Sequence, residues 1–569
     1  MAFQISPGVN VSEIDLTTVV PSVLTTAGAF AGTFQWGPAN KISLIDSEIT
    51  LKKTFGAPDT NSAVSFFTAA NFLSYGNNLS VVRAVGSNCF NSQANTTGAE
   101  IQIANDDDFE VTYLNADNDN AYGAFVARFP GVLGDSLSVE VCSQTSAFSG
   151  WSYKGYFTSA PGTSDYVSAR EGANDEIHIA VVDAGGLFTG TANTVLETFS
   201  FVSKASDASV NGDTNYYKQV IFNTSKYIYA VDPVDYANTS ATWGTTAANT
   251  SYYSPVNASL RLTSGADEVP ALGDLEQAYD LFANKDYVDI SLVLTGDAST
   301  TLQQYVIDNL ANPDPLVDCR RDCVAFISPP KSAVVGQSGS ESTNITTWLD
   351  SLARSSSYVV ADSGWKYQYD KYNNVYRWIP LNGDIAGLCV YTDTVRDPWF
   401  SPAGFNRGQI KNAVKLAWNP SKTYRDTLYA AGVNPVASFP GQGIVLYGDK
   451  TLLNKPSAFD RINVRRLFIT LEKAISQAAR FSLFELNDEF TRAQFVALVT
   501  PFLRDVQGRR GVTDFKVICD TTNNTPSVID SNKFVGDIYI KPARSINYIQ
   551  LNFVAVGTGV DFTTVVGAA

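Results

Sequence analysis

Histidine and cysteine, the residues most often used in nucleophilic catalysis and zinc binding, are scarce in this sequence. His178 is the only histidine among 569 residues, and the six cysteines are widely spaced. A catalytic triad would have to use His178, but a single histidine in an alternating, strand-like stretch is usually an ordinary surface or hydrogen-bonded side chain. Cys319 and Cys323 are four residues apart without a second pair, so a four-ligand zinc site is not expected. We therefore expect no catalytic residues, no metal and no cofactor, and the sparse cysteines favour synthesis in a reducing cytoplasm.

Charged residues and long apolar runs are also in short supply. Charged residues make up 17% of the chain, against about 25% in typical globular proteins, whereas apolar residues reach 44%. This composition excludes a disordered chain and a coiled coil, and the length allows several hydrophobic cores. No run of about 18 apolar residues is present, so we predict no transmembrane segment. The first residues, MAFQISPGVN, lack the basic and apolar regions of a secretory signal.

The charge that is present is unevenly distributed. The net charge of −16 argues against a protein that mainly coats DNA or an anionic membrane. Residues 91–265 contain 19 acidic and 7 basic residues, whereas residues 401–569 contain 13 acidic and 20 basic ones. Two interpretations remain open at this point: the composition differs between domains without functional consequence, or the two regions face different partners, one of them acidic.

Two stretches resemble ligand-binding motifs but differ from them at a decisive position. Residues 443–451 have the glycines, lysine and threonine of a phosphate-binding loop, but Asp449 precedes the lysine and places negative charge where the phosphate would lie. The acidic residues between 106 and 119 lack the glycine that a calcium loop needs at its sixth position, so a solvated acidic loop is expected. Among 56 acidic residues, nothing singles out a carboxylate pair for glycoside cleavage.

Hydrophobic periodicity predicts a mixed α/β, multidomain α+β protein. Helical periodicity alternates with apolar strands on both sides of a β-rich insertion, which indicates a parallel or mixed sheet. The helices are expected at 63–75, 271–284 and 300–310, and the strands at 79–85, 288–294 and 323–327. Two amphipathic helices are expected from about Leu467 to Gly508, followed by strands at 515–519, 534–540 and 549–553. The predicted division is a terminal arm (1–20), a middle α/β domain (21–90 with 266–400), inserted β-rich domains (91–265), a C-terminal α+β domain (401–553) and a terminal strand (554–569).

Both ends of the chain contain strand patterns without an obvious local partner. Val9 and Val11 alternate with polar residues after a Pro-Gly pair. The tail beyond Phe553 has alternating apolar residues and a single charged one, Asp561. A flat, uncharged terminal strand is an aggregation hazard unless it has a dedicated partner, so we expect such a partner here.

Several longer stretches resemble contractile phage tail sheath proteins, most closely those of large T4-like viruses. The opening SPGVNVSEID (6–15) resembles the N-terminal signature of that family, and further similar stretches follow in the family's order. They are 31–38, 129–137, 418–420, 441–452 and 463–467. The similarity covers nearly the whole chain, is closest in residues 400–569 and is weakest in residues 140–265.

The resemblance implies a structural protein of the virion tail, not an enzyme, that is assembled in the host cytoplasm. Such a subunit forms stacked hexameric rings around a tail tube and contracts from a metastable extended state to drive the tube through the host envelope. Its partners would be other copies, the tube protein, and the baseplate and tail terminator proteins, with no direct nucleic acid contact and no stable membrane insertion. The resemblance also implies that terminal strands join neighbouring subunits; the candidate residues are Val9, Val11, Ile14, Val554, Val556, Val560 and Phe562.

The basic C-terminal region supplies candidates for contact with the tube. These are Arg465, Arg466, Lys473, Arg480, Arg504, Arg509 and Arg510. The simpler explanation is that most of them are solvated helix faces or contacts between sheath subunits. Two other functions remain open on the residues alone: a static viral or surface-lattice protein, which would share the terminal strands, and an acidic, β-rich enzyme acting on carbohydrate, which the aromatic content permits.

Overall fold

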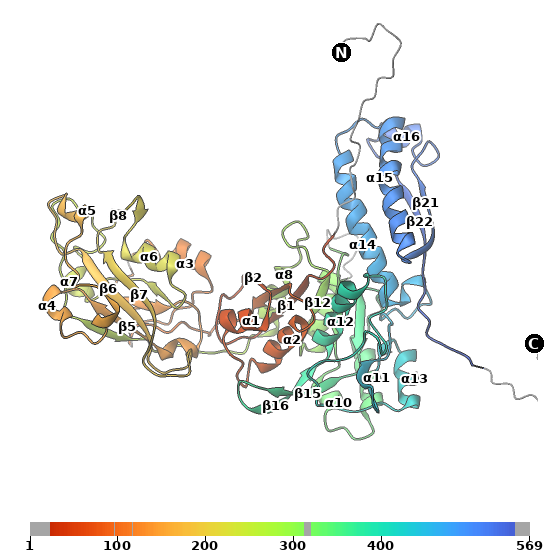
Figure 1. Cartoon of the computed structure of the whole chain (residues 1–569), viewed down its shortest axis with the longest axis horizontal. Helices are drawn as coiled ribbons and strands as arrows, with labels where there is room; N and C mark the ends of the chain where they lie inside the picture. Colours follow the sequence, from red (N-terminus) through yellow and green to blue (C-terminus); the bar gives the residue numbers. More distant parts are fainter. Residues whose placement is uncertain (1–22, 96, 117, 312–319, 552–569) are drawn as a thin grey trace, which may run out of the picture. The chain divides into compact units, whose positions relative to one another are not determined.

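The computed structural model describes residues 23–551, except residues 96, 117 and 312–319. The chain divides into two compact units, Met1–Leu483 and Phe484–Ala569, which are described separately. Helices and strands are mixed in both, so the predicted mixed α/β, multidomain fold is confirmed (Figure 1). Over the described residues, no helix combines the length and apolar character needed to cross a membrane.

The centre of the first unit is a seven-stranded sheet with the order β18-β14-β13-β12-β1-β3-β2. Every neighbouring pair is parallel except the edge pair of β2 and β3. Its inner strands are short apolar runs that are buried on both faces, as expected for parallel strands covered by helices. The bounds are β1 Gly28–Gly32, β2 Ile42–Ile45, β3 Leu79–Arg83, β12 Leu292–Leu294, β13 Val324–Ile327, β14 Val359–Asp362 and β18 Val433–Asn434.

Two hydrophobic cores form on opposite faces of this sheet. Phe30 and Phe326 belong to the core on one face, with side chains from α2, α12 and α14. Ala29 and Ala325, which neighbour them in β1 and β13, belong to the core on the other face, with side chains from α8 and α9. The helices of this unit's α/β part are α1 Glu48–Phe55, α2 Ala63–Leu73, α8 Leu272–Asp280, α9 Thr300–Val306, α10 Lys331–Val334, α11 Glu341–Leu352, α12 Asn382–Val395, α13 Lys422–Ala430 and α14 Ile462–Ala479.

Residues between β3 and α8 form β-rich structure around a further hydrophobic core, to which Trp36 also contributes. The main sheet is antiparallel, with the order β11-β5-β6-β7, and β4 pairs with β10. The strands are β4 Phe125–Ala127, β5 Leu137–Cys142, β6 Glu176–Asp183, β7 Thr194–Ser203, β8 Ser209–Val210, β9 Asp213–Thr214, β10 Ile228–Ala230 and β11 Ala258–Arg261. The helices are α3 Asp106–Thr112, α4 Thr145–Phe148, α5 Asp165–Ser168, α6 Tyr217–Thr224 and α7 Tyr236–Thr239.

Two smaller antiparallel sheets complete the first unit. One has the order β16-β15-β17, and the other is the hairpin of β19 and β20. Their bounds are β15 Trp365–Asp370, β16 Val375–Pro380, β17 Lys415–Leu416, β19 Val436–Phe439 and β20 Gly443–Leu446. The stretch that was compared with a phosphate-binding loop therefore contains strand β20.

The second unit contains α15 Glu489–Gly508, β21 Val512–Ile518, α16 Pro526–Asp530 and β22 Asp537–Pro542. The strands expected at 515–519 and 534–540 are present with shifted ends. The strand expected at 549–553 differs: residues 549–551 are not in a strand, and residues 552 and 553 lie outside the described range.

The central sheet also includes a strand from beyond the predicted domain boundary between residues 400 and 401. Strand β18 lies beyond that boundary and pairs in parallel with β14, with Ala361 opposite Val433. The Asn434 side chain reinforces the edge, because its Nδ2 donates to the Ala361 carbonyl at 3.1 Å. A two-residue strand has too little periodicity to be recognised in the sequence, so its membership of the sheet could not be predicted.

Polar side chains gather at the carboxyl ends of β13 and β14. Ser328 Oγ donates to Asp362 Oδ2 at 2.6 Å, and the Gly364 amide donates to Asp362 Oδ1 at 2.9 Å. Asn382, at the start of α12, donates from Nδ2 to Ser328 Oγ at 2.9 Å. Burial raises the pKa of Asp362 to about 8, against the opposing effect of its two hydrogen bonds, and the nearby carboxyl of Asp384 raises it further.

This carboxyl group predicts a pH dependence of stability. Between about pH 4 and pH 8 the unfolded chain releases the Asp362 proton while the folded chain retains it. The free energy of unfolding should therefore fall as the pH rises, by at most about 1.4 kcal/mol per pH unit. Urea denaturation across this range should show the free energy of unfolding of the wild type falling, relative to that of Asp362→Asn, as the pH rises. Asp350→Asn, which removes an exposed carboxylate from α11, is the matched control, and parallel wild-type and Asp362→Asn curves would contradict the prediction.

Candidate assembly site

Helix α14 carries three of the basic residues that were expected to contact a tail tube. The helix is amphipathic: Leu467, Leu471, Ala474 and Ala478 recur at helical spacing and are buried. No glycine or proline interrupts its 18 residues. The side chains of Arg465, Arg466 and Lys473 extend from this helix. The contacts of each side chain determine whether its charge is exposed.

Arg466 is buried in a bidentate ion pair with Asp393 of α12. Its two terminal nitrogens lie 2.7 Å and 2.6 Å from the two carboxylate oxygens of Asp393. Thr25 Oγ1 donates to the same carboxylate at 2.7 Å, and Arg466 donates to the Thr25 carbonyl at 3.3 Å. Burial on its own lowers the pKa of Arg466, but the charge of Asp393 outweighs this effect, so the pKa lies above its ordinary value and the guanidinium stays charged.

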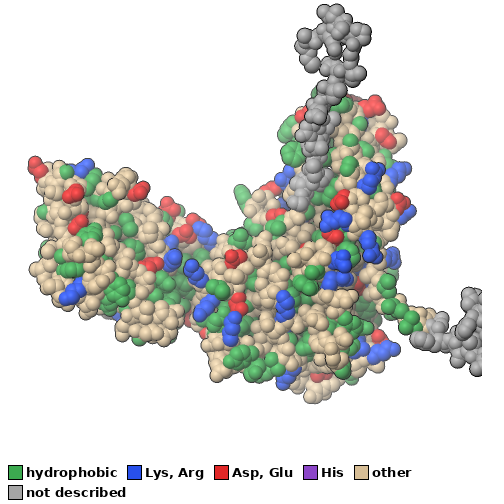
Figure 2. Space-filling view, in the orientation of Figure 1, with side chains coloured by type: hydrophobic (Ala, Val, Ile, Leu, Met, Phe, Trp, Pro, Cys, Tyr) green, Lys and Arg blue, Asp and Glu red, His purple; other side chains and the backbone are tan. Residues whose placement is uncertain are grey.

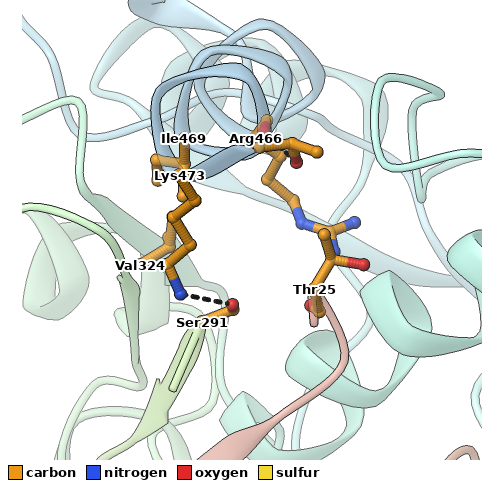
Figure 3. A pocket seen from close by; sticks show the side chains of 7 residues that line it. Thr25, Ser291, Val324, Arg466, Ile469 and Lys473 are labelled. Atoms are coloured by element: carbon orange, nitrogen blue, oxygen red, sulfur yellow. Dashed lines mark hydrogen bonds between the residues drawn. The ribbon is translucent and has the colours of Figure 1, made fainter. Parts of the chain in front are cut away.

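Lys473 lies two turns further along the same face of α14. Its Nζ donates to Asp289 Oδ1 and to the Ile290 carbonyl, both at 2.7 Å, and to Ser291 Oγ at 3.1 Å. Figure 3 shows Arg466 and Lys473 extending from one helix toward Thr25 and Ser291, on either side of a small pocket. These contacts hold α14 against the sheet and against the first described residues of the chain.

Arg465 is held by an aromatic and hydroxyl environment. Its guanidinium lies 4.1 Å from the ring centres of both Tyr358 and Phe459. It donates to Ser357 Oγ at 2.7 Å and to the Tyr358 hydroxyl at 3.1 Å. Burial lowers its pKa, partly offset by Tyr358.

The proposed set of tube-facing residues therefore needs a correction. Arg465 and Arg466 are 6% and 4% exposed and cannot present their charge to a partner in this conformation, and Lys473 is engaged by carboxylates inside the unit. The carboxylate, hydroxyl and backbone carbonyl partners of these residues lie between 73 and 441 positions away, so helical periodicity could not have found them. Arg480, Arg504, Arg509 and Arg510 are exposed.

The second unit contains a sheet of only two strands. Strands β21 and β22 pair from Val512 opposite Pro542 to Ile518 opposite Asp537, with an irregularity near Val512. Within described residues 484–551, no third strand joins either edge. Two-stranded sheets are marginal in water, and open edges expose backbone groups that can pair with another chain.

Apolar side chains around this sheet are exposed. Tyr539 on β22 is 58% exposed, and the segment after β22 exposes further large apolar residues: Ile546, Tyr548, Ile549 and Leu551. The residues expected to exchange between subunits lie outside the described range: Val9, Val11, Ile14, Val554, Val556, Val560 and Phe562. Their assignment stays a prediction.

His178 lies in β6 and is completely buried. Its Nε2 pairs with the Ser159 carbonyl at 2.8 Å, and the Phe201 amide donates to its Nδ1 at 3.1 Å, so both ring nitrogens are satisfied. Burial lowers its pKa, which keeps the ring neutral. Over the described ranges, no three metal-ligating side chains come together.

Comparison with known proteins identifies the family. Residues 292–452 match the model of the phage tail sheath protein central domain, and residues 454–555 match that of the phage tail sheath C-terminal domain. Residues 25–84 match the N-terminal region of domain III of the tail sheath protein Gp18. The tail sheath protein of Vibrio phage KVP40 is 34% identical over 99% of this chain and 100% of its own. The chain belongs to the phage tail sheath protein family.

Further relatives and structures agree with this membership. The tail sheath protein of Enterobacteria phage T4 is 34% identical over 99% of each chain. The sheath tail protein of Listeria innocua has a similar fold, with a TM-score of 0.55 at 10% identity over 93% of this chain and 94% of its own. The contracted helical sheath of the anti-feeding prophage has a TM-score of 0.51 at 14% identity over 97% of this chain and 99% of its own. The resemblance to T4-like sheath proteins is thereby confirmed.

The Arg466–Asp393 pair predicts a large loss of stability when one partner is removed. Arg466→Met should lower the free energy of unfolding by about 3–5 kcal/mol, because Asp393 is left buried without its cation. The measurement is urea or thermal denaturation of the monomeric chain.

Two variants sharpen this test. Arg480→Met removes an exposed pair with Asp286 and should cost less than about 1 kcal/mol. The double variant Arg466→Met with Asp393→Leu should recover much of the loss, because apolar side chains often replace a buried pair at little cost. Equal effects of Arg466→Met and Arg480→Met would contradict the role assigned to the buried pair.

Proposed function

We propose that this tail sheath protein polymerises as stacked hexameric rings around a tail tube and contracts to drive the tube through the host envelope. The observation that carries the proposal is 34% identity to phage tail sheath proteins along essentially the whole chain. The role is structural, without catalysis or a cofactor. Assembly takes place in the host cytoplasm, and the product is part of the virion tail.

Strand exchange would join the subunits. Over the described residues, no third strand pairs with β21 or β22, so their edges are candidate sites for strands from other copies, and the apolar segments at the two chain ends are the candidate strands. In such β-augmentation, main-chain hydrogen bonds hold the strand and alternate side chains set its register. Repeated head-to-tail contacts of this kind build a helical array when they do not close into a ring.

The energy of contraction would be stored during assembly. An extended array held by a kinetic barrier can move to a state with more contact between subunits, without a nucleotide. Rigid modules would rotate while exchanged strands keep them joined. Each main-chain hydrogen bond contributes only about 0.5–1.5 kcal/mol net, but several per strand, repeated over every subunit, would maintain the connections.

The tube, the baseplate and the tail terminator are the proposed partners besides other copies. The exposed basic residues Arg480, Arg504, Arg509 and Arg510 are the remaining candidates for tube contact. A screened electrostatic contact suits a surface that must release the tube during contraction.

Removal of either terminal segment should abolish polymerisation and leave folded subunits. Chains lacking residues 1–18 or 555–569, and the variant Val556→Pro, should have wild-type circular dichroism but form no tubes in electron micrographs. Proline acts here by removing a ladder donor and fixing φ. The full-length chain, co-expressed with a tube protein, is the control, and long tubes from a truncated chain would refute strand exchange.

Salt should weaken the association of sheath with tube. The double variant Arg504→Ser with Arg510→Ser should bind tubes less tightly than the wild type, and the difference should shrink between about 50 mM and 500 mM salt as screening increases. Co-sedimentation with tubes measures this, with Lys285→Ser as an exposed control. Salt-independent association would remove the electrostatic contact from the proposal.

A further inference from the structure

In the three-stranded sheet β16-β15-β17, one face of β15 buries polar side chains, and the opposite face has aromatic side chains that change from buried at Trp365 to exposed at Tyr369. Lys366 of β15 forms a buried ion pair with Asp384 at 2.9 Å, and both side chains are 0% exposed. Gln368, two residues on, accepts a hydrogen bond from Asn71 of α2 at 2.9 Å. Asp370 is also buried and accepts from Arg377. Antiparallel sheets with one solvated face normally have the opposite arrangement.

The outer face is a continuous set of aromatic rings. Tyr367 lies opposite Trp378, and Tyr369 lies opposite Tyr376, across the β15–β16 ladder. The ring centres of these pairs are 4.7 Å and 5.2 Å apart, and Tyr367 stacks on Tyr376 at 5.4 Å. Lys415 of β17 lies 4.9 Å above the Tyr367 ring. We call Tyr367, Tyr369, Tyr376, Trp378 and Lys415 the aromatic face.

This face is accessible to a partner. Tyr369 and Tyr376 are 44% and 50% exposed, and Lys415 is exposed, whereas Tyr367 and Trp378 are half-buried and Trp378 packs against an internal core. Strand β16 is at the edge of its sheet. Figure 2 shows hydrophobic side chains gathered around the β16 end of the molecule, with Lys and Arg side chains nearby. Aromatic residues with little negative charge are typical of the centres of protein interfaces.

The charge around the aromatic face points to an acidic partner. Residues 365–380 and 405–418 contain six basic residues and one acidic residue, Asp370, whose side chain is buried. Lys366 is buried in its pair with Asp384, and Lys371 and Arg377 pair with Glu48 and Asp370, which leaves Arg407, Lys411 and Lys415 outside these pairs. Residues 91–265 of the same chain carry 19 acidic and 7 basic residues. In an assembly of identical subunits, each copy carries both surfaces, and their opposite charge makes them complementary.

We propose that the aromatic face binds the acidic 91–265 region of a second copy of the chain, a contact that rests on the proposed sheath function. This contact is separate from strand exchange, because it uses side chains of a complete sheet rather than open backbone edges. The aromatic rings would supply the apolar contact and Lys415 the selectivity for an acidic surface.

Photo-crosslinking in assembled sheaths tests the proposal. Tyr376→p-benzoylphenylalanine is introduced into the full-length chain, which is co-expressed with a tube protein as a mixture of isotopically light and heavy copies. Irradiation should give crosslinked peptides of mixed isotopic label in which Tyr376 is joined to residues within 91–265. The same substitution at Tyr287, which is 86% exposed and outside the aromatic face, is the matched control.

A charge reversal tests the acidic partner surface. Lys415→Glu should raise the critical concentration for sheath assembly about tenfold relative to Lys455→Glu, an exposed lysine elsewhere in the unit. Circular dichroism checks that both variants are folded. Equal critical concentrations would overturn the acidic partner surface.

The possible outcomes separate this proposal from the proposed function. The interface is overturned if normal sheaths form but Tyr376 crosslinks to the tube protein, crosslinks to another region of the chain, or gives no crosslink. The sheath function is then left intact. A wild-type chain that forms no assemblies with a tube protein overturns the sheath function and the interface with it.

Discussion

The buried pair of Arg466 and Asp393 connects three segments that are distant in the sequence. Arg466 comes from α14, Asp393 from α12, and Thr25 from the first described residues, and all three share one carboxylate. An uncompensated charge at this place would be costly, so the three segments can be buried only together. The central sheet, its covering helix α14 and the chain at Thr25 are thus joined by one buried polar cluster.

The elements with strong periodicity were predictable from the sequence. The helices near 63–75, 271–284 and 300–310 and the strands that alternate with them match α2, α8, α9, β3, β12 and β13 within a few residues. Periodicity reports which face of an element is apolar, and it does not report what that face meets. Arg465 and Arg466 were candidates for tube contact because the C-terminal region is basic, but carboxyl, hydroxyl and aromatic partners inside the unit hold both side chains.

The aromatic face escaped prediction for a related reason. The sequence WKYQYD alternates as a half-buried strand should, but the pattern alone does not say which set of residues faces inward. Asn71, 297 positions before Gln368, and Asp384, 18 positions after Lys366, supply the polar partners that hold Gln368 and Lys366 inside. Tyr367 and Tyr369 then lie on the opposite face, whereas Trp365 on that face is buried.

The attachment of the chain around Thr25 has a mechanical consequence. Ser291 Oγ donates to the Leu24 carbonyl at 2.9 Å, next to the contacts of Thr25 with Asp393 and Arg466. A force applied to the chain before Leu24 would therefore be transmitted to the first unit through a cluster of short polar contacts to α12, α14 and the start of β12. Such a cluster shares the tension among several elements, so the chain would resist being peeled away one hydrogen bond at a time.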